Sequence, residues 1–327
     1  MSIAIGIGGG SPASGGGGGG GQVTIGLSSK IPDYNGSLTI TATPSGISPT
    51  VYTFQISDSE GGIETTQQAS NVLVWTVNKV GTVTISVVAT QGGVEAGATE
   101  TATVTDPLSY AAKLVDYDMR NNITLVSDLI DIVGDSSGNG HDVTATTSAN
   151  RAYYDSYSDR FEAGGGLKAF RNLASNPLSG AGSFTMFAKF QKQASDSTNQ
   201  RLITFGTSGS QFLVGLTSAL GGSVVVGSNN FAQYTSASTN PQAGTPIAIV
   251  KNGTANYAIY SDGALATPTG TGGTVPATLP VGNGIYLGSQ NGSFGFTGAF
   301  QRIVILDGAL TATQIAAVNE RIKVLHP

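Results

Sequence analysis

Residues 83–87, VTISV, show the pattern that decides the fold of this chain. The apolar residues Val83, Ile85 and Val87 alternate with threonine and serine. Because successive side chains of a strand point to opposite faces, this alternation predicts a β-strand with one buried face. The same alternation recurs in residues 38–42, 52–56 and 73–77. The pattern therefore predicts an all-β protein.

Turn residues separate these strand stretches, including the Asn35-Gly36 pair. Short strands divided by such turns are typical of a small antiparallel sandwich. The alternation places Trp75, the single tryptophan, on the inner face, so we expect it in the core. Residues 22–106 resemble the immunoglobulin-like domains of bacterial and phage surface proteins. Asp106-Pro107 marks the predicted end of this domain.

The second part of the chain, residues 107–327, carries its own series of strand stretches, at residues 183–190, 201–205, 211–216, 247–250, 256–260, 284–288 and 299–306. A helix is expected only at its end. Thr311 and Gln314 have the spacing of a capping box. Apolar residues then recur at helical spacing, at Ile315, Val318, Ile322 and Leu325. We predict that this short C-terminal helix packs across a sheet.

Six short motifs in residues 107–327 occur in the order seen in concanavalin A-like, laminin G-like jelly-roll domains. They are DSSGNGHD at residues 135–142, SFT at 183–185, YSDG at 260–263, YLGS at 286–289, FTG at 296–298 and DGALTATQI at 307–315. The resemblance implies two curved antiparallel sheets. Members of this family are mostly glycan- or protein-binding modules, and some branches are glycosidases. The expected fold is therefore an immunoglobulin-like β-sandwich followed by a concanavalin A-like jelly-roll sandwich, with a short C-terminal helix.

Composition narrows the chemistry that the chain can perform. The 327 residues contain no cysteine and two histidines, and the net charge is -5. Without thiols, zinc and iron–sulfur sites and thiol catalysis are not expected. No run of Lys and Arg is interleaved with aromatic residues, so nucleic acid is not an expected partner. No apolar run is long enough for a membrane helix, so we expect no membrane insertion.

The carboxylates predict that the chain is not an enzyme. A retaining glycosidase needs two carboxyl groups about 5.5 Å apart. The only glutamates after residue 106 are Glu162 and Glu320, which lie far apart in unrelated contexts. The two histidines, His141 in a glycine-rich turn and His326 beside the C-terminus, do not suit a catalytic triad.

Residues 135–142 form the first candidate small-ligand site. Oxygen-bearing side chains alternate with glycines that permit a tight path, and the candidate calcium ligands are Asp135, Ser137, Asn139 and Asp142. The alternative is a turn in which these side chains bind their own backbone. Calcium is the one candidate ion, and we predict no other cofactor.

Two aromatic clusters are candidates for glycan binding, because sugar rings stack on aromatic rings and their hydroxyls need polar partners. The denser cluster comprises Tyr153, Tyr154, Asp155 and Tyr157. The second comprises Asn230 and Tyr234. The alternative for both clusters is a structural role in covering the core.

The N-terminal stretch MSIAIGIG is followed by a glycine-rich tether that reaches residue 21. Ile3, Ile5 and Ile7 share one side of an extended chain. Without a basic region or a long apolar core, the stretch does not resemble an export signal. We expect residues 1–21 to be a docking arm that joins the chain to a larger assembly or to its own copies.

Together these features predict a bacteriophage virion structural protein, such as a head fibre, head decoration or tail-associated subunit. It would assemble in the host cytoplasm and be displayed on the virion surface as a homo-oligomer. Its arm would bind other virion proteins, and its laminin G-like domain would face host surface glycans. The alternative is a bacterial cell-surface glycan-binding adhesin.

Overall fold

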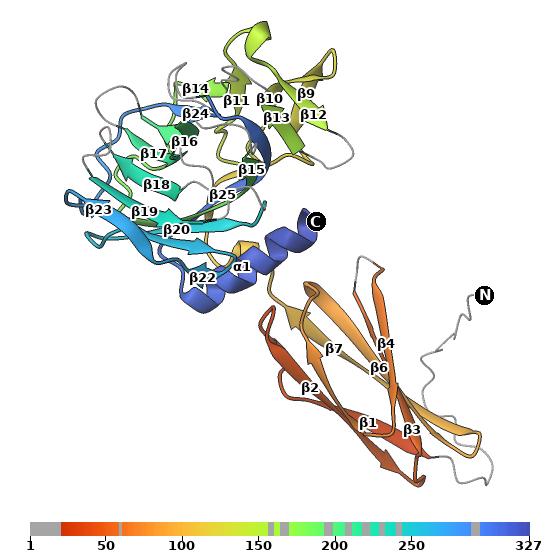
Figure 1. Cartoon of the computed structure of the whole chain (residues 1–327). Coiled ribbons are helices and arrows are strands. Elements are labelled where there is room, and N and C mark those ends of the chain that lie inside the picture. Colours follow the sequence, from red (N-terminus) through yellow and green to blue (C-terminus); the bar gives the residue numbers. More distant parts are fainter. Residues whose placement is uncertain are drawn as a thin grey trace. The chain divides into compact units, whose positions relative to one another are not determined.

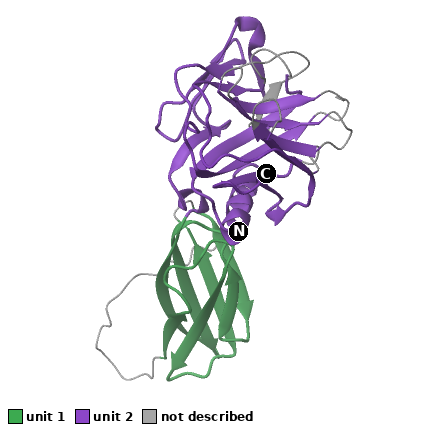
Figure 2. Ribbon diagram, turned by 90° about the vertical axis from the view of Figure 1, so that its left-hand side faces the viewer, with its two compact units in different colours: residues 1–105 green, residues 106–327 purple. Residues whose placement is uncertain are grey.

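The computed structural model describes residues 21–58, 61–155, 160–163, 170–192, 199–206, 211–217, 223–228, 233–239, 244–288 and 295–327. The chain divides into two compact units, residues 1–105 and 106–327 (Figure 2). The predicted docking-arm residues Ile3, Ile5 and Ile7 lie outside the described residues. The fold is all-β with one C-terminal helix among the described residues, which confirms the predicted fold class.

The first unit is a sandwich of two antiparallel sheets. Its strands are β1 (Gln22–Leu27), β2 (Ser37–Ser45), β3 (Val51–Ser57), β4 (Ile63–Gln68), β5 (Val72–Thr76), β6 (Gly81–Gln91) and β7 (Val94–Val104). One sheet has the order β1-β2-β5 and the other has the order β4-β3-β6-β7. The chain therefore crosses between the sheets after β2, after β4 and again after β5. This is the two-sheet architecture that immunoglobulin-like domains use, although the family of this unit stays a prediction.

Strict alternation builds the core of the first unit. Along β6, Val83, Ile85 and Val87 are fully buried while the intervening residues are partly exposed. Trp75 on β5 is buried as well, and its indole Nε1 donates a hydrogen bond of 3.0 Å to Glu64 Oε2 on β4. The apolar body of the indole thus fills the core while its polar end remains satisfied.

The second unit contains many short strands. They are β8 (Lys113–Asp118), β9 (Ile123–Val126), β10 (Leu129–Val133), β11 (Val143–Ala145), β12 (Ala152–Asp155), β13 (Arg160–Ala163), β14 (Phe170–Asn172), β15 (Ser183–Lys192), β16 (Gln200–Phe205), β17 (Phe212–Leu216), β18 (Ser223–Ser228), β19 (Gln233–Ser238), β20 (Ile247–Asn252), β21 (Ala258–Ser261), β22 (Ala264–Leu265), β23 (Pro268–Gly272), β24 (Ile285–Leu287) and β25 (Gly298–Asp307). The helix α1 (Ala312–Leu325) follows them.

These strands form two facing sheets. Antiparallel pairing gives one sheet the order β22-β21-β20-β15-β25-β8. The other sheet has the order β11-β14-β24-β16-β17-β18-β19-β23. A group of hairpins from β9 to β14 lies at one end of the unit, where β13 pairs with β25 of the first sheet and β14 pairs with β24 of the second (Figure 1).

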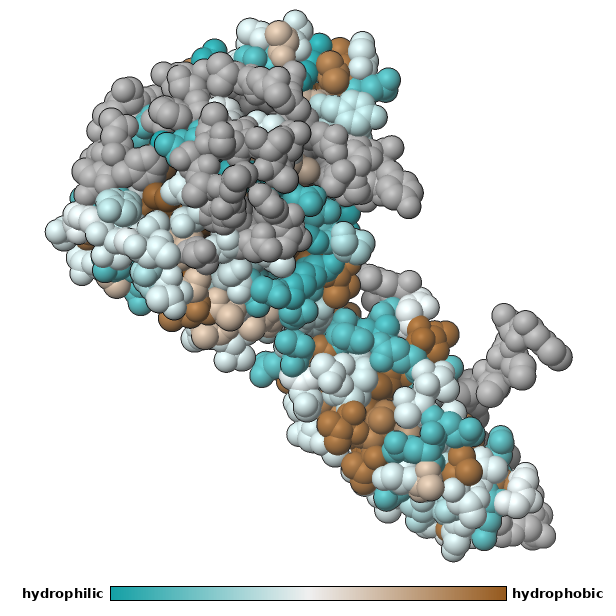
Figure 3. All heavy atoms as spheres, viewed as in Figure 1, coloured by the Kyte–Doolittle hydropathy of each residue, from teal (hydrophilic) through white to brown (hydrophobic). Residues whose placement is uncertain are grey.

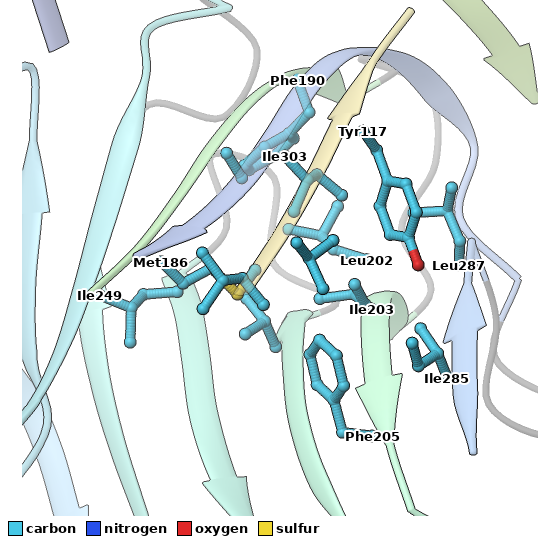
Figure 4. Close-up of a cluster of buried hydrophobic side chains, with 14 of the residues drawn as sticks. Tyr117, Met186, Phe190, Leu202, Ile203, Phe205, Ile249, Ile285, Leu287 and Ile303 are labelled. Carbon is cyan, nitrogen blue, oxygen red and sulfur yellow. The ribbon is translucent and has the colours of Figure 1, made fainter. Parts of the chain in front are cut away.

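The core of the second unit lies between these two sheets (Figure 4). On β15, Phe184, Met186, Ala188 and Phe190 point into it, because alternate residues of a strand share a face. Side chains from the opposite sheet meet them, and Phe212 makes an edge-to-face contact with Phe184 at a centroid distance of 5.3 Å. The sheet β16–β19 therefore has one face committed to the core and one face directed away from it.

Helix α1 covers the outer face of the other sheet. Ile315, Val318 and Ile322 pack there on apolar side chains from β15, β20 and β25. The predicted capping box is present, because Thr311 Oγ1 accepts a hydrogen bond from the Gln314 backbone and Gln314 Oε1 accepts one from the Thr311 backbone. This packing explains why β15, β20 and β25 are buried on both faces.

The end of the chain is held against the sheet by polar groups that are buried or partly buried. Arg120 Nη1 donates to the carbonyl of Leu325 at 2.7 Å, and Lys189 Nζ donates to the carbonyl of His326. The imidazole of His326 is buried, and its Nε2 lies 3.4 Å from Asp118 Oδ1. Burial lowers the pKa of His326 to about 4, since the cationic form would lose its hydration.

We expect acid to destabilise the second unit through this histidine. Its folded pKa lies below its ordinary value, so the unfolded chain binds more protons as the pH falls from about 6.5 to about 4. The free energy of unfolding should fall by about 2–3 kcal/mol across this range. Urea unfolding at several pH values measures the slope. His326→Phe, which cannot titrate, should flatten it, and an unchanged slope in the variant would assign the acid sensitivity to other groups.

The surface is only weakly charged. Figure 3 shows pale side chains over much of both units, with separate teal and brown patches. This agrees with a chain in which only 11% of residues are charged. Within the described part of the chain, no helix has the length and apolar composition needed to cross a membrane.

Candidate functional site

A pocket lies on the sheet of β16–β19 and β23. Figure 1 shows β16–β19 and β23 of this sheet. Its volume is about 260 Å³, and its lining includes Asn199, Arg201, Leu216, Thr217, Val225, Tyr234 and Ser236. The register places several of these residues in one row across the sheet, since Arg201 lies opposite Gly215, Gly215 opposite Val225, and Val225 opposite Ser236. The alternate residues Val214, Val224 and Ala237 face the core. The row therefore belongs to the outer face of this sheet.

The lining combines one aromatic ring with several hydrogen-bonding groups. Ser236 Oγ lies 3.1 Å from Thr269 Oγ1 and can donate to the carbonyl of Gly270 at 3.3 Å. Thr217 Oγ1 accepts a hydrogen bond of 3.0 Å from the Ser223 backbone, which leaves its own proton to donate. The Asn199 side chain is exposed at the rim.

Arg201 is the only charged side chain in the described lining of this pocket. It is 5% exposed, and its Nη1 donates to the Gln200 carbonyl at 3.3 Å. Burial lowers the pKa of Arg201 to about 10, because the low-dielectric surroundings disfavour the cation. The guanidinium is still protonated at neutral pH and supplies several fixed donors. No carboxylate is among the described lining residues.

Only part of the two predicted aromatic clusters is within the described structure. Tyr234 lines the pocket, whereas its predicted companion Asn230 lies outside the described residues. Tyr153 on β12 is 54% exposed, and Tyr154 packs against the core of the second unit. The side chains of Asp155 and Tyr157 lie outside the described residues. The pocket thus brings Tyr234 together with residues that the sequence did not single out, above all Arg201 and Ser236.

The predicted calcium loop is held by hydrogen bonds within it and to β8. The carboxylate of Asp135 accepts hydrogen bonds from the Asp116 and Ser137 backbones, both at 2.9 Å, and from Ser137 Oγ at 2.7 Å. Asp142 Oδ1 accepts one from the Asp135 backbone at 2.7 Å. Asn139 Nδ2 donates to the Lys113 carbonyl at 2.8 Å. Hydrogen bonds of this kind are typical of a capped turn, and the calcium site stays a prediction.

The same loop is tied to the core rather than to a ligand pocket. Tyr117, which lies in the buried cluster of Figure 4, donates from its hydroxyl to the His141 carbonyl at 2.6 Å. Burial raises the pKa of Tyr117, and the nearby Asp135 and Asp142 carboxylates raise it further. Among the described residues, no group of three or more acidic or histidine side chains has a geometry that could hold a metal ion.

Comparison with known proteins supports the expected fold of the second unit. Residues 164–316 match the model of the concanavalin A-like lectin/glucanases superfamily. This confirms the predicted concanavalin A-like, laminin G-like jelly roll. No curated protein matches the chain.

Several solved structures are similar to the chain at low identity. A variant of HCR/D is 12% identical, with a TM-score of 0.46 over 65% of this chain and 52% of that chain. Domain 4 of AbnA, an extracellular GH43 arabinanase of Geobacillus stearothermophilus in complex with arabinotriose, is 16% identical, with a TM-score of 0.41 over 64% of this chain and 98% of that chain. Trypanosoma rangeli sialidase is 10% identical, with a TM-score of 0.45 over 93% of this chain and 54% of that chain. The chain thus spans about half the length of HCR/D and of the sialidase.

Proposed function

We propose that the second unit is a carbohydrate-binding module whose ligand occupies the pocket on the sheet of β16–β19 and β23. The observation that carries this proposal is the lining of the pocket, in which the Tyr234 ring lies among the Arg201, Asn199, Thr217 and Ser236 side chains. A sugar presents both an apolar face and many hydroxyls, so it needs this mixture of ring and polar groups. The match of residues 164–316 to a lectin/glucanase superfamily supports the same function.

We propose further that the module binds its ligand without cleaving it. Hydrolysis of a glycosidic bond requires a carboxylic acid and a second carboxylate at the same site. The described lining of the pocket contributes neither. Glu320, one of the two glutamates of this unit, instead lies on α1 and pairs with Lys323 at 2.8 Å.

A glycan array tests this function with the full chain. We expect the chain to retain a subset of immobilised glycans and to release no cleaved sugar that mass spectrometry detects. Ser236→Phe, which fills the pocket, should abolish retention, whereas Tyr153→Ala, in the other aromatic cluster, should not. Failure to retain any glycan would contradict carbohydrate binding, and release of shortened glycans would contradict the absence of catalysis.

In the finer proposal, the chain is a bacteriophage virion subunit that carries this module on the virion surface. Three features of the sequence support it: the alternating isoleucines Ile3, Ile5 and Ile7, the glycine tether that follows them, and two β-sandwiches without cysteine. Burial of the isoleucines could supply on the order of 5 kcal/mol to docking in a groove or at a sheet edge. A bacterial cell-surface adhesin is the second candidate, favoured by the lectin-like module alone.

Deletion of residues 1–20 tests the anchoring role. We expect the truncated chain to fold normally, because the described strands begin at Gln22, and to be absent from purified particles. Mass spectrometry of particles assembled with either form measures incorporation. Equal incorporation of the truncated and full chains would contradict a docking arm.

A further inference from the structure

Three glycines on the outer face of the second sheet lie within strands, where the backbone φ does not require glycine. Gly227 lies in β18, and Gly270 and Gly272 lie in β23. None of the three has the positive φ that favours glycine elsewhere in this chain. Glycine within a strand weakens it, since it adds no side-chain contact and loses more conformational freedom on folding. A different requirement must account for them.

All three glycines lie beside Tyr234, and two of them, Gly270 and Gly272, face its ring. A Cβ atom at Gly272 would lie 2.4 Å from Tyr234 Cε1, and one at Gly270 would lie 3.6 Å from Cε2. A Cβ at Gly227 would lie 2.4 Å from the Gln233 backbone oxygen and 3.0 Å from the Tyr234 Cβ, so Gly227 admits the neighbouring strand and not the ring itself. The register explains this placement, because Tyr234 lies directly opposite Gly227 on one side and Gly272 on the other. The ring therefore occupies the space over β23 that side chains at 270 and 272 would fill.

The glycines thus fix the ring against the sheet at the pocket. A tyrosine with full-sized neighbours would be forced to stand away from the sheet, whereas here the ring contacts both glycine positions and still lines the pocket. A ring that is held in this way offers a rigid apolar platform at little entropic cost on binding. The hydroxyl of Ser236 and the guanidinium of Arg201 lie in the adjoining row of the same face.

The volume of the pocket limits what can lie on this platform. About 260 Å³ is below the roughly 300–1,000 Å³ of pockets that enclose whole drug-sized ligands. We infer, on the basis of the carbohydrate-binding function proposed above, that the pocket takes a single pyranose ring at the end of a glycan, stacked on Tyr234. A pyranose ring presents C–H groups to the aromatic face while its hydroxyls reach the polar lining. The ligand class is therefore a terminal sugar and not the interior of a polysaccharide chain.

Glycan arrays and titrations with the full chain test this inference. We expect retention of glycans that end in one type of pyranose, and competition by the corresponding methyl pyranoside within about ten-fold of the glycan itself. Tyr234→Ala should weaken binding by about ten-fold or more, and Tyr234→Phe should retain it. Gly272→Ala should weaken binding like Tyr234→Ala, because its methyl group displaces the ring.

Gly97→Ala is the matched control for the glycine substitution. Gly97 also lies within a strand, β7 of the first unit, but a Cβ there meets only ordinary contacts, the nearest at 3.5 Å. We expect this variant to bind as the native chain does. Circular dichroism checks the folding of each variant, and if Gly272→Ala does not fold, the two Tyr234 variants still decide the question.

The outcomes separate this inference from the function on which it rests. Glycan binding that survives Tyr234→Ala, or that requires the interior of a long chain and ignores the methyl pyranoside, would overturn the single-ring site and leave carbohydrate binding intact. Binding to no glycan at all would overturn both.

Discussion

Lys251→Met is expected to lower the free energy of unfolding of the second unit by about 3–4 kcal/mol. Lys251 lies at the end of β20 and is fully buried. Its ammonium nitrogen lies within hydrogen-bond distance of four backbone carbonyls, which share its three protons: those of Gly182 at 3.0 Å, Gly253 at 2.7 Å, Pro276 at 2.9 Å and Ala277 at 3.1 Å.

The Lys251 ammonium joins three segments that are distant in sequence. They precede β15, follow β20 and connect β23 to β24. Burial lowers the pKa of Lys251, because the charged ammonium loses its hydration by water. Methionine preserves the length of the side chain but leaves the carbonyls without their shared cationic donor. A buried carbonyl that loses its donor is destabilising, because its lost hydration free energy is no longer offset by a hydrogen bond.

Urea unfolding followed by circular dichroism measures the effect of Lys251→Met. The fluorescence of Trp75, the single tryptophan, reports on the first unit. The urea concentration at the midpoint of this unit's unfolding should be the same in the variant and the native chain. Lys323→Met is the control, since Lys323 is 31% exposed and pairs with Glu320 on the surface of α1. It should cost less than about 1 kcal/mol. Equal losses in the two lysine variants would contradict the structural role of the buried ammonium.

Arg302→Met is expected to cost about 3–5 kcal/mol, because it removes the buried guanidinium from Asp116 and Asp118 and leaves Asp116 only the partly exposed Lys113. Arg302 on β25 binds Asp116 on β8 through two hydrogen bonds, from Nε at 3.0 Å and from Nη2 at 2.8 Å. Its Nη1 also lies 3.3 Å from Asp118 Oδ2. Burial raises the pKa of Asp118, but Arg120 and Arg302 favour the carboxylate and hold the pKa below its ordinary value.

Arg151→Met is the matched control for Arg302→Met. Arg151 Nε binds Asp131 Oδ1 at 2.6 Å, but the two side chains are 23% and 25% exposed, so water can replace the contact. Its loss should cost under about 1 kcal/mol. Adding Asp116→Asn to Arg302→Met should recover part of the stability, since it removes the buried charge that has lost its arginine partner. A double variant that is less stable than Arg302→Met alone would contradict this account.

Local alternation predicted the fold class because a buried face leaves a direct trace in the sequence. Residues 83–87 form part of β6 with the predicted face inward, and the capping box at Thr311 begins α1. The double burial of β15, β20 and β25 was harder to anticipate, since it depends on where α1 packs. The buried ion pairs of Arg302 with Asp116 and Asp118 join β25 to β8. Arg302 and Asp116 are 186 residues apart in sequence, so no local sequence pattern predicts their contact.

The candidate site was only partly visible in the sequence for the same reason. The sequence indicates Tyr234 as an aromatic residue near an amide. Arg201 and Ser236 come together at the pocket only because β16, β17, β18 and β19 pair in this register. The glycines beside Tyr234 are a sequence feature that could have indicated this site. Glycines at alternate positions of a strand, as at 270 and 272, mark a face where another group approaches closely.

Titration of the full chain carrying ¹³C-labelled tyrosine rings tests the central claim most directly. The chain has 11 tyrosines, and Tyr234→Phe assigns the resonance of Tyr234. On addition of a glycan that the array identifies, the ring signal of Tyr234 should shift saturably while that of Tyr153 stays unchanged. A saturable shift at Tyr153 or Tyr154 with no change at Tyr234 would contradict the claim that the glycan occupies the pocket on the second sheet.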